Sequence, residues 1–178
     1  MRTARVVRIF ICAAIICSII VIALPGAASA CTDPVTVYRL YNKVTGEHLY
    51  TSDINEKHAI LDKYPGVWVY EGVGYVVDGA VAADPLYRFY NKKNGTHFYT
   101  ADPVEKERVK NTLASVYAFE GAAFNVSRDP GAGAGVYRFY NKKTGSHFYT
   151  ADEAEKNAVL AKLGGTYTLE GQAYYLPY

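Results

Sequence analysis

The chain has 178 residues, half of them hydrophobic, and 17 are tyrosines. Its 19 lysines and arginines nearly balance its 17 aspartates and glutamates, and no run of basic residues stands out. This charge pattern argues against nucleic acid as a partner, because phosphate binding relies on clustered basic side chains.

The first thirty residues have the three-part pattern of a secretory signal peptide. Three arginines precede residue 9, residues 9–24 are almost wholly apolar, and residues 27–30 are small. This order predicts export, with cleavage before Cys31. The alternative is an uncleaved membrane anchor, but the apolar run is shorter than the roughly 20 residues that a membrane span needs. The expected location is therefore extracellular.

Loss of residues 1–30 changes the charge and the cysteine count. The segment holds three arginines and no acidic residue, which leaves 16 basic groups against 17 acidic ones. It also holds two of the three cysteines, so Cys31 alone remains and no intramolecular disulfide is expected. Cys31 at the new N-terminus is either an incidental thiol or a lipidation site that anchors the chain at the cell surface. A large apolar residue usually stands three positions before a lipidated cysteine, whereas Ala28 stands here.

Three copies of one unit account for the mature chain. Each copy holds a Tyr-Arg-(Leu/Phe)-Tyr-Asn segment, then a His-(Leu/Phe)-Tyr-Thr segment, then a Glu-Gly pair. These begin at Tyr38, Tyr87 and Tyr137, at His48, His97 and His147, and at Glu71, Glu120 and Glu170. We place the repeats at residues 35–77, 86–126 and 136–178, within a single domain of residues 31–178.

Each repeat is predicted to fold as strand-strand-helix-strand-strand, which gives an α+β class. The first two strands alternate and are rich in aromatic residues. A four-residue loop that ends in a glycine joins them. An Asp and a Glu three residues apart then predict a helix N-terminus with reciprocal capping. These pairs are Asp53/Glu56, Asp102/Glu105 and Asp152/Glu155. Two short strands joined near the Glu-Gly pair complete the repeat.

The repeats are expected to depend on one another, because each exposes an apolar face that only a neighbour can cover. Closure around a pseudo-threefold axis, as in a trefoil or a propeller, leaves no open sheet edge. A linear stack is the alternative arrangement.

The motifs resemble a repeat family of unknown function found in secreted bacterial and fungal proteins. The resemblance covers essentially all of residues 35–178. Similar repeats are often attached to extracellular hydrolases, including cell-wall enzymes, which implies a role facing the envelope or a carbohydrate. The resemblance assigns no functional residue.

One face of the first hairpin is the candidate ligand-binding surface. A four-residue loop places Tyr41 opposite His48 and Arg39 opposite Tyr50. Tyrosine offers a flat ring and a hydroxyl that suit sugars, and Arg and His add directional hydrogen bonds. The candidate residues are Arg39, Tyr41, His48, Tyr50, Arg88, Tyr90, His97, Tyr99, Arg138, Tyr140, His147 and Tyr149. The alternative is that these side chains brace each hairpin against its neighbours.

No catalytic residue, metal ion or cofactor is predicted. The three equivalent histidines would form a metal site only if a threefold axis gathered them. The glutamates of the Glu-Gly pairs resemble turn residues more than an acid and base in different environments.

We therefore expect a secreted, non-catalytic module that binds cell-envelope or extracellular polysaccharide, and that meets a membrane only through its signal peptide or a lipid on Cys31. The alternatives are a structural or protein-interaction domain and, after it, a cell-wall hydrolase. A polar residue that differs in a single repeat would favour an enzyme, whereas three matching exposed clusters would favour binding.

Overall fold

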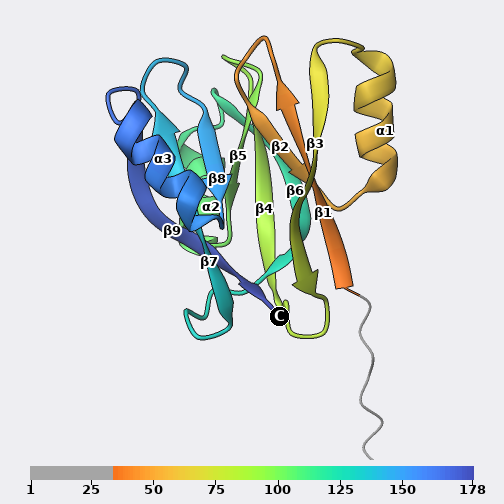
Figure 1. The fold of residues 1–178 in the computed structure, drawn as a ribbon, viewed down its shortest axis with the longest axis vertical. Coiled ribbons are helices and arrows are strands. Elements are labelled where there is room, and N and C mark those ends of the chain that lie inside the picture. The colour runs from red at the N-terminus through yellow and green to blue at the C-terminus, as the bar shows by residue number, and fades with distance from the viewer. Residues whose placement is uncertain (1–33) are drawn as a thin grey trace, which may run out of the picture. The chain divides into compact units, whose positions relative to one another are not determined.

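The computed structural model describes residues 34–178, so the predicted signal peptide and Cys31 lie outside the described residues. These residues form three similar repeats, each with two short strands, a helix and a longer strand (Figure 1). Repeat 1 contains β1 (Pro34–Asn42), β2 (His48–Thr51), α1 (Ile54–Lys63) and β3 (Trp68–Asp78). Repeat 2 contains β4 (Asp84–Asn91), β5 (Thr96–Thr100), α2 (Pro103–Thr112) and β6 (Tyr117–Val126). Repeat 3 contains β7 (Gly133–Asn141), β8 (His147–Thr150), α3 (Glu153–Leu163) and β9 (Tyr167–Pro177).

The fold is mostly β. Each repeat holds its own three-stranded antiparallel sheet, with the first strand in the centre, in the orders β2-β1-β3, β5-β4-β6 and β8-β7-β9. The three sheets remain separate within the described part of the chain. None of the helices of residues 34–178 is long and apolar enough to cross a membrane.

The first hairpin forms as predicted. Tyr41 pairs with His48 and Arg39 with Tyr50, which is the register of a four-residue loop. The loop ends at Gly46 with a φ of 71°, a conformation that glycine adopts without steric cost. The side chain of Asn42 accepts a hydrogen bond from the backbone of Val44 and closes the turn.

The second predicted hairpin is wrong, because one continuous strand takes its place in each repeat. Along β1, Arg39 pairs with Gly72 and the next residue, Leu40, pairs with Tyr70, so that Glu71 is passed over. The Glu-Gly pair is therefore a β-bulge, and Gly72 has a φ of 115°. A bulge bends and twists a strand without reversing it, and it re-aims the side chain of the extra residue. Repeats 2 and 3 have the same register shift.

Half of the predicted capping pattern is confirmed. Asp53, Asp102 and Asp152 each accept a hydrogen bond from the backbone two residues later, at the start of their helix. The glutamates three residues on do not close the reciprocal half, since their carboxylates bond arginines of other repeats.

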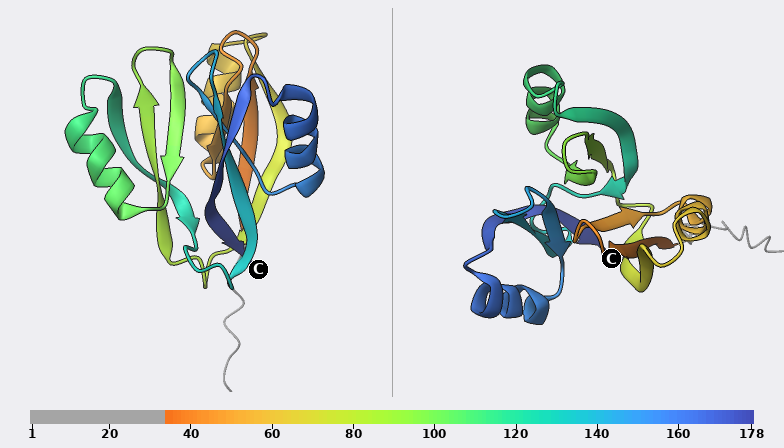
Figure 2. Two further views of the ribbon diagram at one scale, coloured as in Figure 1. Left: turned by 90° about the vertical axis from the view of Figure 1, so that its left-hand side faces the viewer. Right: turned by 90° about the horizontal axis from the view of Figure 1, so that it is seen from above.

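The main hydrophobic core is shared by all three repeats. It contains Val37, Tyr50 and Val77 from repeat 1 and their counterparts from repeats 2 and 3. Figure 2 shows the repeats pointing in different directions from this core, each with its helix on the outer side. A smaller cluster of Phe89, Phe98 and Val109 lies between the sheet of repeat 2 and α2. In the second strand of each hairpin, two successive side chains that point to opposite faces, such as Leu49 and Tyr50, are both buried.

Three tyrosine hydroxyls bond the repeats together inside this core. Tyr50 donates to the carbonyl of Tyr149, Tyr149 to that of Tyr99, and Tyr99 to that of Tyr50, at 2.5, 2.9 and 3.0 Å. The three rings are also packed edge to face, with centroids 5.6–6.0 Å apart. Each tyrosine thus fills the core and satisfies a backbone group of another repeat.

Candidate functional site

An arginine from each repeat bonds a glutamate of another repeat. The arginine lies in the centre of the first strand, and the glutamate lies in the first turn of the helix. The three bonds join Arg88 to Glu56, Arg138 to Glu105 and Arg39 to Glu155, with shortest distances of 2.8, 2.8 and 3.1 Å. Burial raises the pKa of Glu56, but the hydrogen bonds from Arg88 and Thr51 and the charge of Arg88 together outweigh burial and leave the pKa below its usual value. The carboxylate therefore stays ionised.

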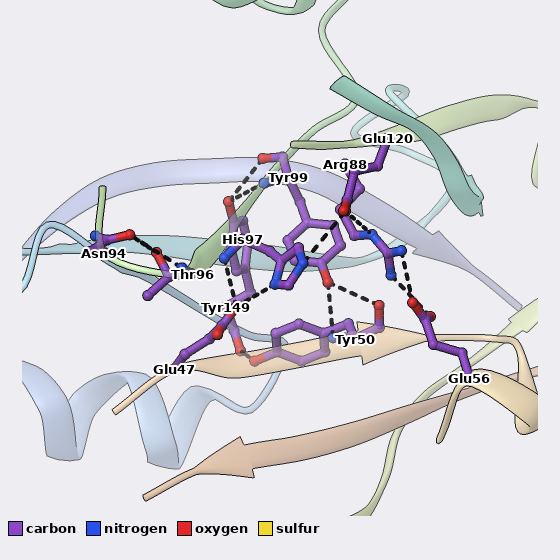
Figure 3. Close-up of polar contacts among 10 residues, drawn as sticks. All are labelled: Glu47, Tyr50, Glu56, Arg88, Asn94, Thr96, His97, Tyr99, Glu120 and Tyr149. Carbon is purple, nitrogen blue, oxygen red and sulfur yellow. Dashed lines mark hydrogen bonds and ion pairs between the residues drawn. The ribbon is translucent and has the colours of Figure 1, made fainter. Parts of the chain in front are cut away.

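The bulge supplies a second carboxylate to the same arginine. Glu120 accepts a hydrogen bond from Arg88 Nε at 2.8 Å, and its Oε2 lies 3.5 Å from Nε2 of His97. Because the bulge passes Glu120 over in the strand register, its side chain joins Arg88 and His97 on one face of the sheet. Figure 3 shows Arg88 between Glu56 and Glu120, beside His97. The other two boundaries have the same arrangement around Arg39 and Arg138.

The boundary between repeats 1 and 2 opens into a cleft of about 400 Å³, here called the first cleft. Its aromatic lining consists of Trp68 and Tyr64 of repeat 1 and Tyr90 of repeat 2. Its polar lining consists of Asn42, Thr45, Glu56, Arg88, His97 and Glu120.

The boundary between repeats 2 and 3 forms a smaller second cleft of about 160 Å³. Three of the substitutions at equivalent positions change the aromatic lining. Phe98 replaces Leu49, Leu113 replaces Tyr64 and Tyr117 replaces Trp68. The bulkier Phe98 fills space that Leu49 leaves open, and the aromatic lining is reduced. The first cleft is therefore both the larger and the more aromatic of the two.

A buried carboxylate lies next to the first cleft and breaks the likeness between the repeats. Glu47 is fully buried, and its Oε1 lies 2.6 Å from both the backbone N and the ring Nδ1 of His97. Its Oε2 has no hydrogen-bond partner among the described residues. Thr96 and Ser146 occupy the equivalent positions. Sequence reasoning missed Glu47, although its one signal was visible: a single acidic residue where the other copies have a hydroxyl.

The other two histidines lie in different electrostatic surroundings. Burial, followed by the charge of Arg39, lowers the pKa of His48 to about 4. Burial and Arg138 lower the pKa of His147 to about 4 in the same way. Both rings are therefore neutral at pH 7, and they contact the tilted rings of Tyr41 and Tyr140, with centroids 5.0 and 5.3 Å apart. Within residues 34–178, no group of three or more His, Cys, Asp or Glu side chains is placed to hold a metal ion.

The twelve predicted site residues divide into two sets. Tyr50, Tyr99 and Tyr149 are at most 1% exposed, so they pack the core and leave the predicted surface. Pattern reasoning placed them on a solvent face because it treated the hairpin as buried on one side only. The arginines and histidines are partly buried at the boundaries between repeats. Tyr90 and Tyr140 remain 37% exposed, and Tyr41 is half-buried.

Comparison with known proteins finds one relationship. The family model described as domain of unknown function DUF5648 matches residues 28–177. The match confirms the predicted relation to a family of unknown function, whereas the motif signature and the number of repeats are no part of that description. No curated protein and no solved structure matches the chain.

Proposed function

We propose that this chain, which belongs to the DUF5648 family of domains of unknown function, is a non-catalytic module that binds an extracellular polysaccharide in the first cleft. The observation that carries the proposal is the composition of this cleft. Trp68, Tyr64 and Tyr90 offer rings for the apolar faces of sugar residues, while Arg88 and Glu120 offer hydrogen bonds to hydroxyl groups. Binding sites commonly combine an apolar lining with a few such polar groups.

The other boundaries would add weaker contacts to the same polymer. Tyr140 is as exposed as Tyr90 and lies beside His147, which lines the second cleft. Linked weak sites gain affinity on a polymeric surface because the second contact becomes intramolecular. A cell-envelope polysaccharide is therefore the leading ligand class, and a structural or protein-interaction role is the alternative.

We infer further that the repeats close around a pseudo-threefold axis. Two sets of contacts support this closure. The tyrosine hydroxyl bonds and the arginine–glutamate bonds each link repeat 1, repeat 2 and repeat 3 in a cycle. A linear stack would leave its terminal repeats without one such contact.

Export is part of the proposal. The basic, apolar and small-residue segments of residues 1–30 favour a signal peptide, and Cys31 offers a site for a lipid anchor. Both place the binding module outside the cell.

A hydrolase is the second candidate, because Glu47 differs from its counterparts in a single repeat, as a catalytic residue would. Two observations favour binding instead. Glu47 is fully buried and bonds His97. Glu56 and Glu120 both accept hydrogen bonds from Arg88, so neither is placed as a proton donor.

The test is retention of the exported protein on insoluble peptidoglycan, chitin and cellulose. We expect retention on at least one polymer, and about fivefold weaker retention for Tyr90→Ala, since one aromatic contact contributes about 1 kcal/mol. Tyr140→Ala is the matched control, because Tyr140 has the same exposure but does not line the first cleft, and it should lose less. Release of sugar from any of these polymers would support the hydrolase, whereas no retention on any of them would overturn the proposal.

A further inference from the structure

We propose that the first cleft selects glycans that carry free primary amino groups, an inference that rests on the proposed function and names its substrate class. The selecting feature is an excess of carboxylate. Glu56 and Glu120 share the single guanidinium of Arg88. Glu47 and Glu120 also flank His97, so three carboxylates face one arginine and one histidine at this boundary.

The second cleft shows how this excess is removed at an equivalent site. There Glu105 bonds both Arg138 and Arg108, so two arginines face the two carboxylates of Glu105 and Glu170. The residue at the position of Arg108 in repeat 1 is Ala59, which is exposed on α1. The first cleft thus lacks the neutralising arginine that the second one has.

Glu47 makes the first cleft more receptive to a cation. The oxygen of Glu47 that lies 2.6 Å from Nδ1 also accepts the backbone N–H of His97, which favours the ring tautomer with its proton on Nδ1. Nε2 is then left as an acceptor, 3.5 Å from the carboxylate of Glu120. Such fixing of a histidine tautomer by a carboxylate behind it is common where the front nitrogen binds a ligand.

These groups together match an ammonium ion on a sugar ring. The ammonium would donate to Glu120 and to Nε2 of His97, and the nearby ring of Tyr90, with its centroid 5.4 Å from that of His97, adds a cation–π contact. The rings of Trp68 and Tyr64 hold the apolar face of the sugar. An N-acetyl group carries no charge and loses this recognition.

Trp68 makes the test specific to this site, because it is the only tryptophan of the chain and lines the first cleft. Its emission is followed while the exported protein is titrated with oligomers of glucosamine, N-acetylglucosamine and glucose of equal length. We expect the glucosamine oligomer to bind about tenfold more tightly than the other two at low ionic strength. Added salt should reduce this preference.

Ala59→Arg is the decisive variant, since it copies the arginine of repeat 2 onto an exposed position. It should abolish the preference for glucosamine and leave the affinity for glucose oligomers unchanged. Ala158→Arg, at the equivalent exposed position of repeat 3, is the matched control and should keep the preference. Glu47→Thr, which copies repeat 2, should weaken the preference in the same direction as Ala59→Arg.

Two results would overturn the inference while the proposed function stands: equal binding of the three oligomers, or a preference that survives in Ala59→Arg. Binding of none of the three oligomers would overturn this inference, and the retention experiment on polymers would then decide the proposed function separately.

Discussion

The guanidinium of Arg138 in repeat 3 holds the carboxylate of Glu105 in repeat 2, with N–O distances of 2.8 and 3.3 Å. Glu105 occupies the third position of α2, where a glutamate ordinarily caps its own helix. Here the helix start is capped by Asp102 alone, which frees Glu105 to bond the next repeat. The capping motif thus serves two purposes: one residue starts the helix, and the other joins the repeats.

Removing this carboxylate should destabilise the fold. In Glu105→Gln, Arg138 keeps only the carboxylate of Glu170 as a partner. The side chain of Arg138 is 16% exposed, so water replaces the lost partner poorly. We expect the free energy of unfolding to fall by about 1–3 kcal/mol, as for other hydrogen bonds to charged, poorly solvated groups. The measurement is a urea unfolding curve.

The control for this variant is Arg128→Gln. Arg128 bonds Asp84 at 2.7 Å, but its side chain is 53% exposed. Solvent-exposed pairs contribute about 0–1 kcal/mol, so this change should have little effect. Equal losses of unfolding free energy from the two variants would show that the bond between Arg138 and Glu105 stabilises the fold no more than an exposed ion pair does.

The core tyrosines should respond to loss of a single oxygen. The hydroxyl of Tyr99 donates to the carbonyl of Tyr50 and accepts from its backbone N–H, at 3.0 and 3.1 Å. Tyr99→Phe leaves both buried groups unpaired, so we expect a loss of about 2–4 kcal/mol. Tyr90→Phe, at a half-exposed position, should change the melting temperature by little. Equal melting of the two variants would contradict the role of the tyrosines in joining the repeats.

Local patterns predicted much of each repeat. The loop glycine, the register of the first hairpin and the Asp caps all depend on residues close in the sequence. The Glu-Gly pair was misread as a turn, because a glycine at positive φ suits a bulge as well as a turn. Only the pairing of β3 along all of β1 decides between them.

Contacts between repeats could not be predicted from the sequence of a single repeat. An alternating strand normally has one solvent-facing side, yet β2 buries both Leu49 and Tyr50, because a neighbouring repeat covers the second face. The repeated motif did not reveal this burial, since a residue kept in every copy is compatible with packing between repeats and with ligand binding. The position of Glu47 was the exception, and its partner His97 lies 50 residues away.

A single repeat should not fold alone. In the fragment of residues 34–83, the core residues Val37, Tyr50 and Val77 would face water, and Tyr50 would lose its bonds to repeats 2 and 3. We expect no cooperative thermal transition in circular dichroism, because repeat units depend on their neighbours for a covered core. A sharp transition from this fragment would show that the repeats are independent folding units.

Acid should destabilise the protein through two of its histidines. The pKa values of His48 and His147 fall from 6.5 to about 4 on folding, through burial first and then through the charges of Arg39 and Arg138. Between these pH values the unfolded chain binds protons that the folded chain does not. Stability is therefore complete above about pH 6.5 and falls as the pH drops towards 4, by up to about 3 kcal/mol for each histidine. The measurement is the free energy of unfolding between pH 7 and 5, a range above the usual pKa of the carboxylates.

His147→Gln should reduce the slope of stability against pH, whereas His58→Gln, at an exposed position of α1, should leave it unchanged. An unaltered slope in His147→Gln would mean that the ring is protonated in the folded protein, and that its burial beside Arg138 does not govern the acid response.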